Sequence, residues 1–279
     1  MTATLHAPEI TVRDRVDQRV VRRRLGPGRR IRFAFWIGPV LALALWSAGS
    51  ASGIIKPAVL SAPWDVVVAF EDQWVNHDLL GNILSSLQRA AIGLTLGVVT
   101  GAVLAVVSGL SRIGESLVDG PIQIKRSIPT LALIPLFIAW FGIGEEMKII
   151  TIALISLVPI YIHTHNGLRT IDSRYVELAQ TVGLSQWDFV RRVVLPGALP
   201  GFLLGLRFAV TGAWLSLVVV EQINSTSGIG YMMELARTYG QTDIIIVGLV
   251  VYGVLGLLSD AVVRLVQRRA LSWRRTLAS

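Results

Sequence analysis

Long uninterrupted apolar segments set the strongest limit on how this chain folds. Residues 201–222 carry only Arg207 and Glu221 as charged side chains, and residues 147–166 carry only Lys148. A helix of about 20 apolar residues crosses the hydrocarbon core of a bilayer. With 53% apolar residues and a mean hydropathy of +0.61, the chain belongs to the membrane class. The apolar runs are continuous rather than alternating, so they predict helices and not a closed barrel.

We predict an all-α membrane protein with six transmembrane helices. Their ranges are 33–54, 82–109, 122–142, 147–166, 201–222 and 243–266, between a basic tail at 1–32 and another at 267–279. The stretch FGIGEE (141–146) supplies the tight turn between the third and fourth spans. The first span also resembles the apolar part of a cleaved signal peptide, but the long tail before it favours a retained anchor.

The distribution of basic residues predicts the orientation. With the amino terminus in the cytoplasm, 22 of the 26 lysines and arginines lie on the cytoplasmic side, since only Lys56, Lys148, Arg237 and the intramembrane Arg89 do not. Both tails and a hairpin at about 170–196 are then cytoplasmic. The net charge of +8 reflects these inside-facing arginines, and the amino-terminal tail is expected against anionic lipid head groups. The charge therefore does not indicate a nucleic-acid partner.

The polar stretch 175–200 predicts two short helices joined by a tight turn. Gly183 stands where a helix ends in a left-handed residue. Ser185, with Asp188 three positions later, forms a capping box for a second helix that runs from Gln186 to Pro196. Two interpretations stay open. The hairpin is either a rigid lever that docks on another protein or a plain connector between the fourth and fifth spans.

Prolines and ionisable residues mark candidate positions for a path or gate through the membrane. Pro129 and Pro135 each remove an intrahelical hydrogen bond and bend the third span, and Thr130 lies between them. Arg207 and Glu221 are costly to bury and should face the bundle interior or a watery cavity. A structural role is the alternative for both. Arg207 then reaches to the cytoplasmic surface, and Glu221 caps the outer end of its span.

Small residues recur at four-residue spacing in two spans and predict close helix packing rather than a pore lining. They are Gly93, Gly97 and Gly101 in the second span, and Gly197, Gly201, Gly205, Ala209 and Ala213 in the fifth.

Metal and catalytic sites are not expected. His163 and His165 lie on different faces of a helix, and no carboxylate or cysteine completes a ligand set. No serine has a catalytic motif around it. The sequence also lacks a GxxxxGK[ST] phosphate-binding loop, so we expect no ATP hydrolysis by this chain.

The hairpin resembles the permease subunits of binding-protein-dependent ABC importers. Their cytoplasmic signature begins Glu-Ala-Ala, continues to a glycine, and ends in Leu-Pro. The matching residues are Glu177, Ala179, Gly183, and Leu195–Pro196 or Leu199–Pro200, with Leu178 in place of the first alanine. The match extends from about residue 57 to 273. Segments such as RSIPTLALIPLFIAWFGIGEEMKI look like the subfamily that moves nitrate, sulfonates, taurine or bicarbonate.

The resemblance implies a type I importer arrangement in a bacterial plasma membrane. The expected partners are a second copy of the chain, two ATP-binding cassette subunits that hold ATP and Mg, and an extracytoplasmic solute-binding protein or lipoprotein. No cofactor is expected on this chain. The coupling residues would be Glu177, Ala179, Gly183, Leu184 and Trp187.

The solute is open at this stage. An aliphatic sulfonate or taurine is the first candidate, and nitrate, bicarbonate or a heterocyclic precursor are the alternatives. A secondary, ion-coupled transporter is the rival function, but it typically needs acidic groups or broken helices near the membrane midplane in paired halves. No predicted span holds an acid at its centre, and Glu221 lies near an end.

Overall fold

The computed structural model describes residues 34–223 and 225–273, and every regular element in these ranges is a helix. The chain divides into two units at Leu45 and Trp46, and α1 (Ala34–Ala51) crosses that boundary. The other elements belong to the second unit. They are α2 (Pro63–Asn76), α3 (Leu79–Leu110), α4 (Arg112–Ser127), the 3-10 turn η1 (Thr130–Leu133), α5 (Ile134–Phe141), α6 (Glu145–Arg169), α7 (Ser173–Thr181), α8 (Gln186–Phe189), the π-helical turn η2 (Val190–Val194), α9 (Leu195–Glu221), α10 (Ile229–Thr238) and α11 (Thr242–Ala270).

Four helical segments of the described chain are long and apolar enough to cross a membrane. They are α3, α6, the continuous segment Gln186–Glu221 and α11, and they correspond to the second, fourth, fifth and sixth predicted spans. A fifth candidate is the pair Arg112–Ser127 and Thr130–Phe141, whose halves meet at 88°. The range predicted for the first span holds a shorter apolar helix, Trp36–Ala51. The all-helical membrane class is therefore confirmed with four or five candidate spans.

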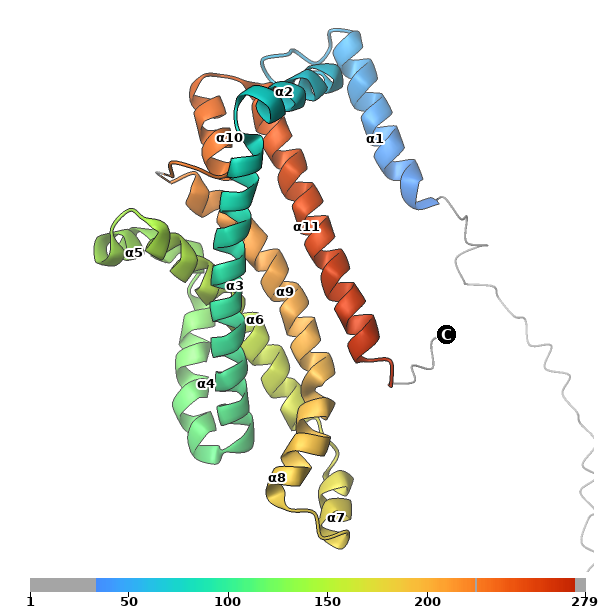
Figure 1. Cartoon of the computed structure of the whole chain (residues 1–279), viewed down its shortest axis with the longest axis vertical. Coiled ribbons are helices and arrows are strands. Elements are labelled where there is room, and N and C mark those ends of the chain that lie inside the picture. The colour runs from blue at the N-terminus through green and yellow to red at the C-terminus, as the bar shows by residue number, and fades with distance from the viewer. Residues whose placement is uncertain (1–33, 224, 274–279) are drawn as a thin grey trace, which may run out of the picture. The chain divides into compact units, whose positions relative to one another are not determined.

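The helix α6 packs between α3 and α9 in the middle of the second unit (Figure 1). A Cβ atom on Gly97 would lie 2.4 Å from the carbonyl oxygen of Ala153, and one on Gly201 would lie 2.4 Å from that of His163. The predicted small-residue stripes thus form the two contact faces. Lipid tails are as apolar as leucine, so helices in a membrane gain from this backbone-to-backbone approach rather than from hydrophobic burial alone.

The third predicted span, 122–142, is not one bent helix. α4 begins already at Arg112, runs back alongside α3, and ends at Ser127, after which the chain turns towards α5 (Figure 1). Ile128 adopts extended backbone angles because a residue before proline avoids the helical region. The prediction that Pro135 bends a helix is wrong. It lies in the first turn of α5, where its missing N–H needs no partner.

The segment before α3 forms a short helix. The helix α2 begins at Pro63 and buries Val66, Ala69 and Gln73. Its two tryptophans, Trp64 and Trp74, are each about half accessible. An exposed tryptophan pair on a short helix is typical of a membrane interface.

Replacing Gly97 with valine should separate α3 from α6, because the new side chain would meet the backbone of α6. Overpacking of this kind costs about 1–3 kcal/mol. We expect a lower melting temperature in detergent for Gly97→Val. Gly256→Val on α11 is the matched control, since nothing lies within 4 Å of a Cβ at Gly256. Equal melting temperatures for the two variants would contradict the close α3–α6 contact.

Candidate functional site

The turn between α7 and α8 has the geometry that the glycine predicts. Gly183 has φ of 71°, and its N–H donates to the carbonyl oxygen of Gln180 at 3.1 Å. The N–H of Leu184 donates to the carbonyl oxygen of Ala179 at 2.9 Å. These two bonds form a Schellman motif, which ends α7 in a fixed direction.

The second half of the hairpin starts on Ser185. Its hydroxyl oxygen accepts from the Asp188 N–H at 3.1 Å and donates to the Asp188 carboxylate at 2.7 Å. The helix that begins here does not end at Pro196, as predicted, but continues unbroken to Glu221. The π turn Val190–Val194 precedes this proline and accommodates its missing N–H in the first turn of α9. The hairpin and the span therefore share one helix.

The hairpin presents an apolar surface to its surroundings. Leu178, Val182 and Trp187 are more than half exposed, and Trp187 reaches 70%. Of the predicted coupling residues, Glu177 is also exposed, whereas Ala179 is buried. Leu178 and Val182 are not among the predicted coupling residues, although their spacing of four places them on one helix face. Exposed apolar clusters of this kind mark interaction sites with another protein, a membrane or a ligand.

A buried ionic cluster joins the ends of several helices. The Glu221 carboxylate is fully buried and accepts hydrogen bonds from Arg89 at 2.8 Å and from Tyr252 at 2.8 Å. Ser86 donates to it at 2.7 Å, and the Gly230 N–H donates at 2.9 Å. A buried charge is tolerated when it is paired and hydrogen-bonded in this way. Glu221 therefore has a structural position that joins α3, α9, α10 and α11.

Arg89 extends this cluster to the start of α6. Its guanidinium contacts Glu145 with Nε at 2.5 Å and Nη2 at 2.8 Å, and Nη1 donates to the carbonyl oxygen of Ser227 at 2.7 Å. Glu145 also pairs with Lys148 at 3.0 Å. Glu145 is about half exposed while Arg89 is buried, so the cluster reaches from the interior to the surface.

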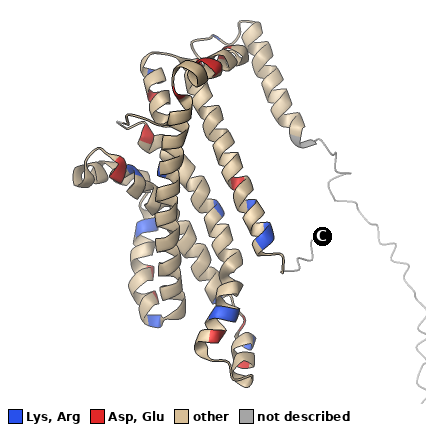
Figure 2. Ribbon diagram, in the orientation of Figure 1, with Lys and Arg blue, Asp and Glu red and all other residues tan. Residues whose placement is uncertain are grey.

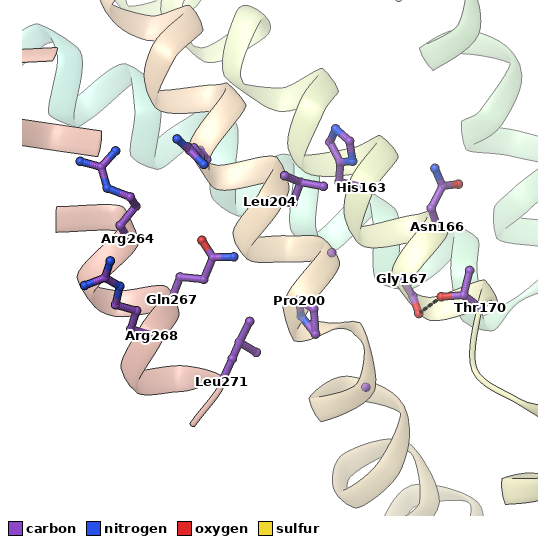
Figure 3. Close-up of a pocket in the computed structure, with 13 residues that line it drawn as sticks. His163, Asn166, Gly167, Thr170, Pro200, Leu204, Arg264, Gln267, Arg268 and Leu271 are labelled. Atoms are coloured by element: carbon purple, nitrogen blue, oxygen red, sulfur yellow. Dashed lines mark hydrogen bonds between the residues drawn. The ribbon is translucent and has the colours of Figure 1, made fainter. Parts of the chain in front are cut away.

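Arg207 lies in another part of the molecule. It pairs with Asp260 at 2.8 Å, and Asp260 also pairs with Arg264. A cavity of about 820 Å³ adjoins this group (Figure 3). Its lining includes Arg264, Gln267 and Arg268 of α11, His163 and Asn166 of α6, and Pro200 and Leu204 of α9. Basic residues gather at this end of the unit, near the hairpin (Figure 2).

The five predicted path residues do not meet at one place. Arg207 and Glu221 are 14 residues apart on α9, which corresponds to about 21 Å along the helix. Pro129 and Thr130 lie at the break between α4 and α5, and Pro135 lies at the start of α5.

A cation lies next to this break, in the last turn of α4, although the charge distribution predicts a cytoplasmic position for it. The Lys125 ammonium donates to the Thr130 hydroxyl at 2.9 Å and to the carbonyl oxygen of Leu154 at 2.5 Å. Leu154 belongs to α6, so these bonds tie the end of α4 and the start of η1 to the neighbouring span.

The two histidines of α6 face different neighbours. His163 stacks on Phe208 of α9 with ring centroids 5.2 Å apart, and His165 stacks on Tyr161 at 5.5 Å. Among the described residues, no group of three His, Asp or Glu side chains is arranged to hold a metal ion.

Comparison with known proteins decides the family. Residues 93–272, more than half of the chain, match the family described as "Binding-protein-dependent transport system inner membrane component". The chain belongs to this family. Its members are the inner-membrane components of transport systems that depend on a binding protein. As a member, the chain is a permease component and not the ATPase of such a system.

Individual relatives align with this chain along most of their length. The chain is 44% identical to the putative aliphatic sulfonates transport permease protein SsuC of Escherichia coli strain K12, over 87% of this chain and 92% of the relative. It is 38% identical to the protein of the same name in Bacillus subtilis strain 168, over 90% and 91%. The taurine transport system permease protein TauC of E. coli strain K12 is 29% identical, over 95% and 98%.

The fold of this permease has a solved counterpart. A chain from the crystal structure of an amino acid ABC transporter with histidines aligns with a TM-score of 0.57 and 19% identity. The alignment covers 68% of this chain and 92% of that one.

Proposed function

We propose that this permease forms the translocation path for an aliphatic sulfonate or taurine in an ATP-driven importer. The observation that carries the proposal is the 44% identity to a protein named as an aliphatic sulfonate permease, over 87% of this chain. Two further features support import driven by a separate ATPase. The sequence lacks a phosphate-binding loop, and the α7–α8 hairpin offers an exposed apolar surface centred on Trp187.

In this proposal the hairpin is the coupling element that docks on an ATP-binding cassette subunit. Trp187 and Glu177 provide exposed contacts, Ala179 packs inside the hairpin, and Gly183 with Leu184 sets its angle. Because α8 continues into α9, a displacement of the docked hairpin would move the span as well. A plain connector would not need a helix shared with the membrane segment.

The proposed assembly contains two copies of this chain, two ATPase subunits that hold ATP and Mg, and an extracytoplasmic binding protein. Each copy would contribute six membrane segments, with α1 as the first and the bent pair α4–α5 as the third. Both termini would be cytoplasmic, in contact with the anionic lipid surface. The segment around Pro129 and Thr130, together with Arg207, would lie along the path, and Glu221 would hold its outer end closed.

The direct test of this function is uptake into vesicles by the reconstituted importer. We expect ATP-dependent, binding-protein-dependent uptake of an alkanesulfonate or taurine, and little uptake of nitrate, bicarbonate or a neutral heterocycle. Uptake that responds to an ion gradient and not to ATP would indicate the secondary transporter instead. ATP-dependent uptake of nitrate alone would show that nitrate, and not a sulfonate or taurine, is the transported solute.

Replacing Gly183 with valine should uncouple the ATPase from the membrane subunit. No atom lies within 4 Å of a Cβ at Gly183, so the effect comes from the positive φ, which costs a β-branched residue about 1–3 kcal/mol. We expect less ATPase subunit to co-purify and a loss of solute-stimulated hydrolysis.

The chain supplies a matched control for this variant. Gly240 has φ of 69°, is equally open, and ends α10 with the same two hydrogen bonds, from Gly240 to Arg237 and from Gln241 to Ala236. On the proposed topology it lies on the opposite side of the membrane. Gly240→Val should therefore retain the ATPase subunit. If both variants retain it equally, the hairpin is only a connector.

A further inference from the structure

On the proposed topology Lys125 lies within the membrane, although its sequence position beside Arg126 suggests a cytoplasmic end. It is 13 residues from the start of α4 at Arg112, or about 20 Å along that helix. Its hydrogen-bond partner Leu154 is 15 residues from the end of α6 at Arg169, or about 22 Å. Both helices thus place Lys125 about 20 Å from the end that carries the Glu115–Arg169 ion pair, which on the proposed topology lies within a hydrocarbon core of roughly 30 Å.

The charge of Lys125 is not neutralised by the surrounding protein. An ammonium group has three N–H donors, and two of them bind Thr130 and the Leu154 carbonyl oxygen. Throughout the described ranges, no carboxylate forms an ion pair with Lys125 and no acceptor takes the third N–H. Arg89 and Arg207, by contrast, each pair with an acid. Ionisable residues inside membrane segments are costly to bury, pair with one another or with backbone carbonyls, and mark substrate or ion pathways.

The surroundings of Lys125 are suited to a transient contact. The helical hydrogen-bond pattern is interrupted between Ser127 and Thr130, and the flanking Ile128 and Pro129 are exposed on this chain. Broken helices at membrane depth occur where the chain is buried in protein or lines a water-filled cavity. On the proposed path, the break lines such a cavity and gives a solute access to the ammonium group.

We propose that Lys125 is a binding residue for the transported anion, and that its ammonium contacts the sulfonate oxygens as the anion passes the break between α4 and α5. This inference rests on the proposed function. The two hydrogen bonds to the protein hold the ammonium in place, and one donor with a full positive charge faces no competing protein acceptor. One such contact offsets part of the free-energy cost of desolvating a monovalent oxyanion, but it is too weak to hold the anion permanently.

The test uses the absence of native cysteine. In the complete importer, Lys125→Cys should lower uptake of the transported anion about tenfold or more, as expected for loss of a charge-assisted hydrogen bond. Treatment with 2-aminoethyl methanethiosulfonate attaches an ammonium group through a disulfide and should restore uptake. Methyl methanethiosulfonate adds a neutral group to the same sulfur and should not restore it.

One more variant separates anion binding from a structural role. Lys125→Arg keeps the charge and should retain most uptake. If Lys125→Cys transports normally, if the neutral reagent restores uptake equally well, or if Lys125→Arg loses as much uptake as Lys125→Cys, Lys125 does not bind the anion.

The wild-type importer in the same assay distinguishes the two proposals. If it transports sulfonates, a negative result for Lys125 overturns only this inference. If it transports another anion, the solute assignment fails. Uptake of that anion by the Lys125→Cys importer, with and without the two reagents, then tests Lys125. Transport of a neutral or cationic solute would overturn both.

Discussion

The close contact of α6 with both α3 and α9 is the interaction on which the rest of the structure depends. Glycines at 97 and 201 let the backbones touch at distances that a single methyl group would prevent. In a bilayer, where apolar surface gains little from leaving lipid, such contacts decide which helices pair. Because α6 is held on both sides, it fixes the span that continues into the hairpin. It also offers the Leu154 carbonyl oxygen to Lys125.

The segment Gln186–Glu221 connects the two polar regions of the second unit. Its 36 residues correspond to about 54 Å of helix. One end carries the Ser185 cap and the hairpin, and the other ends in the buried pair of Glu221 with Arg89. If the hairpin docks on an ATPase subunit as proposed, this helix would transmit a displacement to the span, provided that the π turn Val190–Val194 does not bend.

The sequence predicts features that depend on local chemistry. The left-handed Gly183, the Ser185 cap and the glycine faces of two spans follow from spacing and residue type, and the structure contains all three. It does not predict features that depend on how the helices fold back. Arg89 meets Glu221 across 132 positions. The start of α4 at Arg112 lies alongside α3, in a stretch that the predicted spans leave as a cytoplasmic loop up to residue 121.

The most direct test of a rigid connection between hairpin and span is one distance within a single chain. Spin labels at Gln186→Cys and Leu215→Cys, both exposed positions, should be about 44 Å apart along the helix. Labelled chains diluted into unlabelled ones restrict the measurement to one copy. We expect pulsed electron paramagnetic resonance to give the same narrow distance with and without ATP bound to the partner subunits. A distance that shifts or broadens when ATP binds would show that the hairpin moves independently of α9.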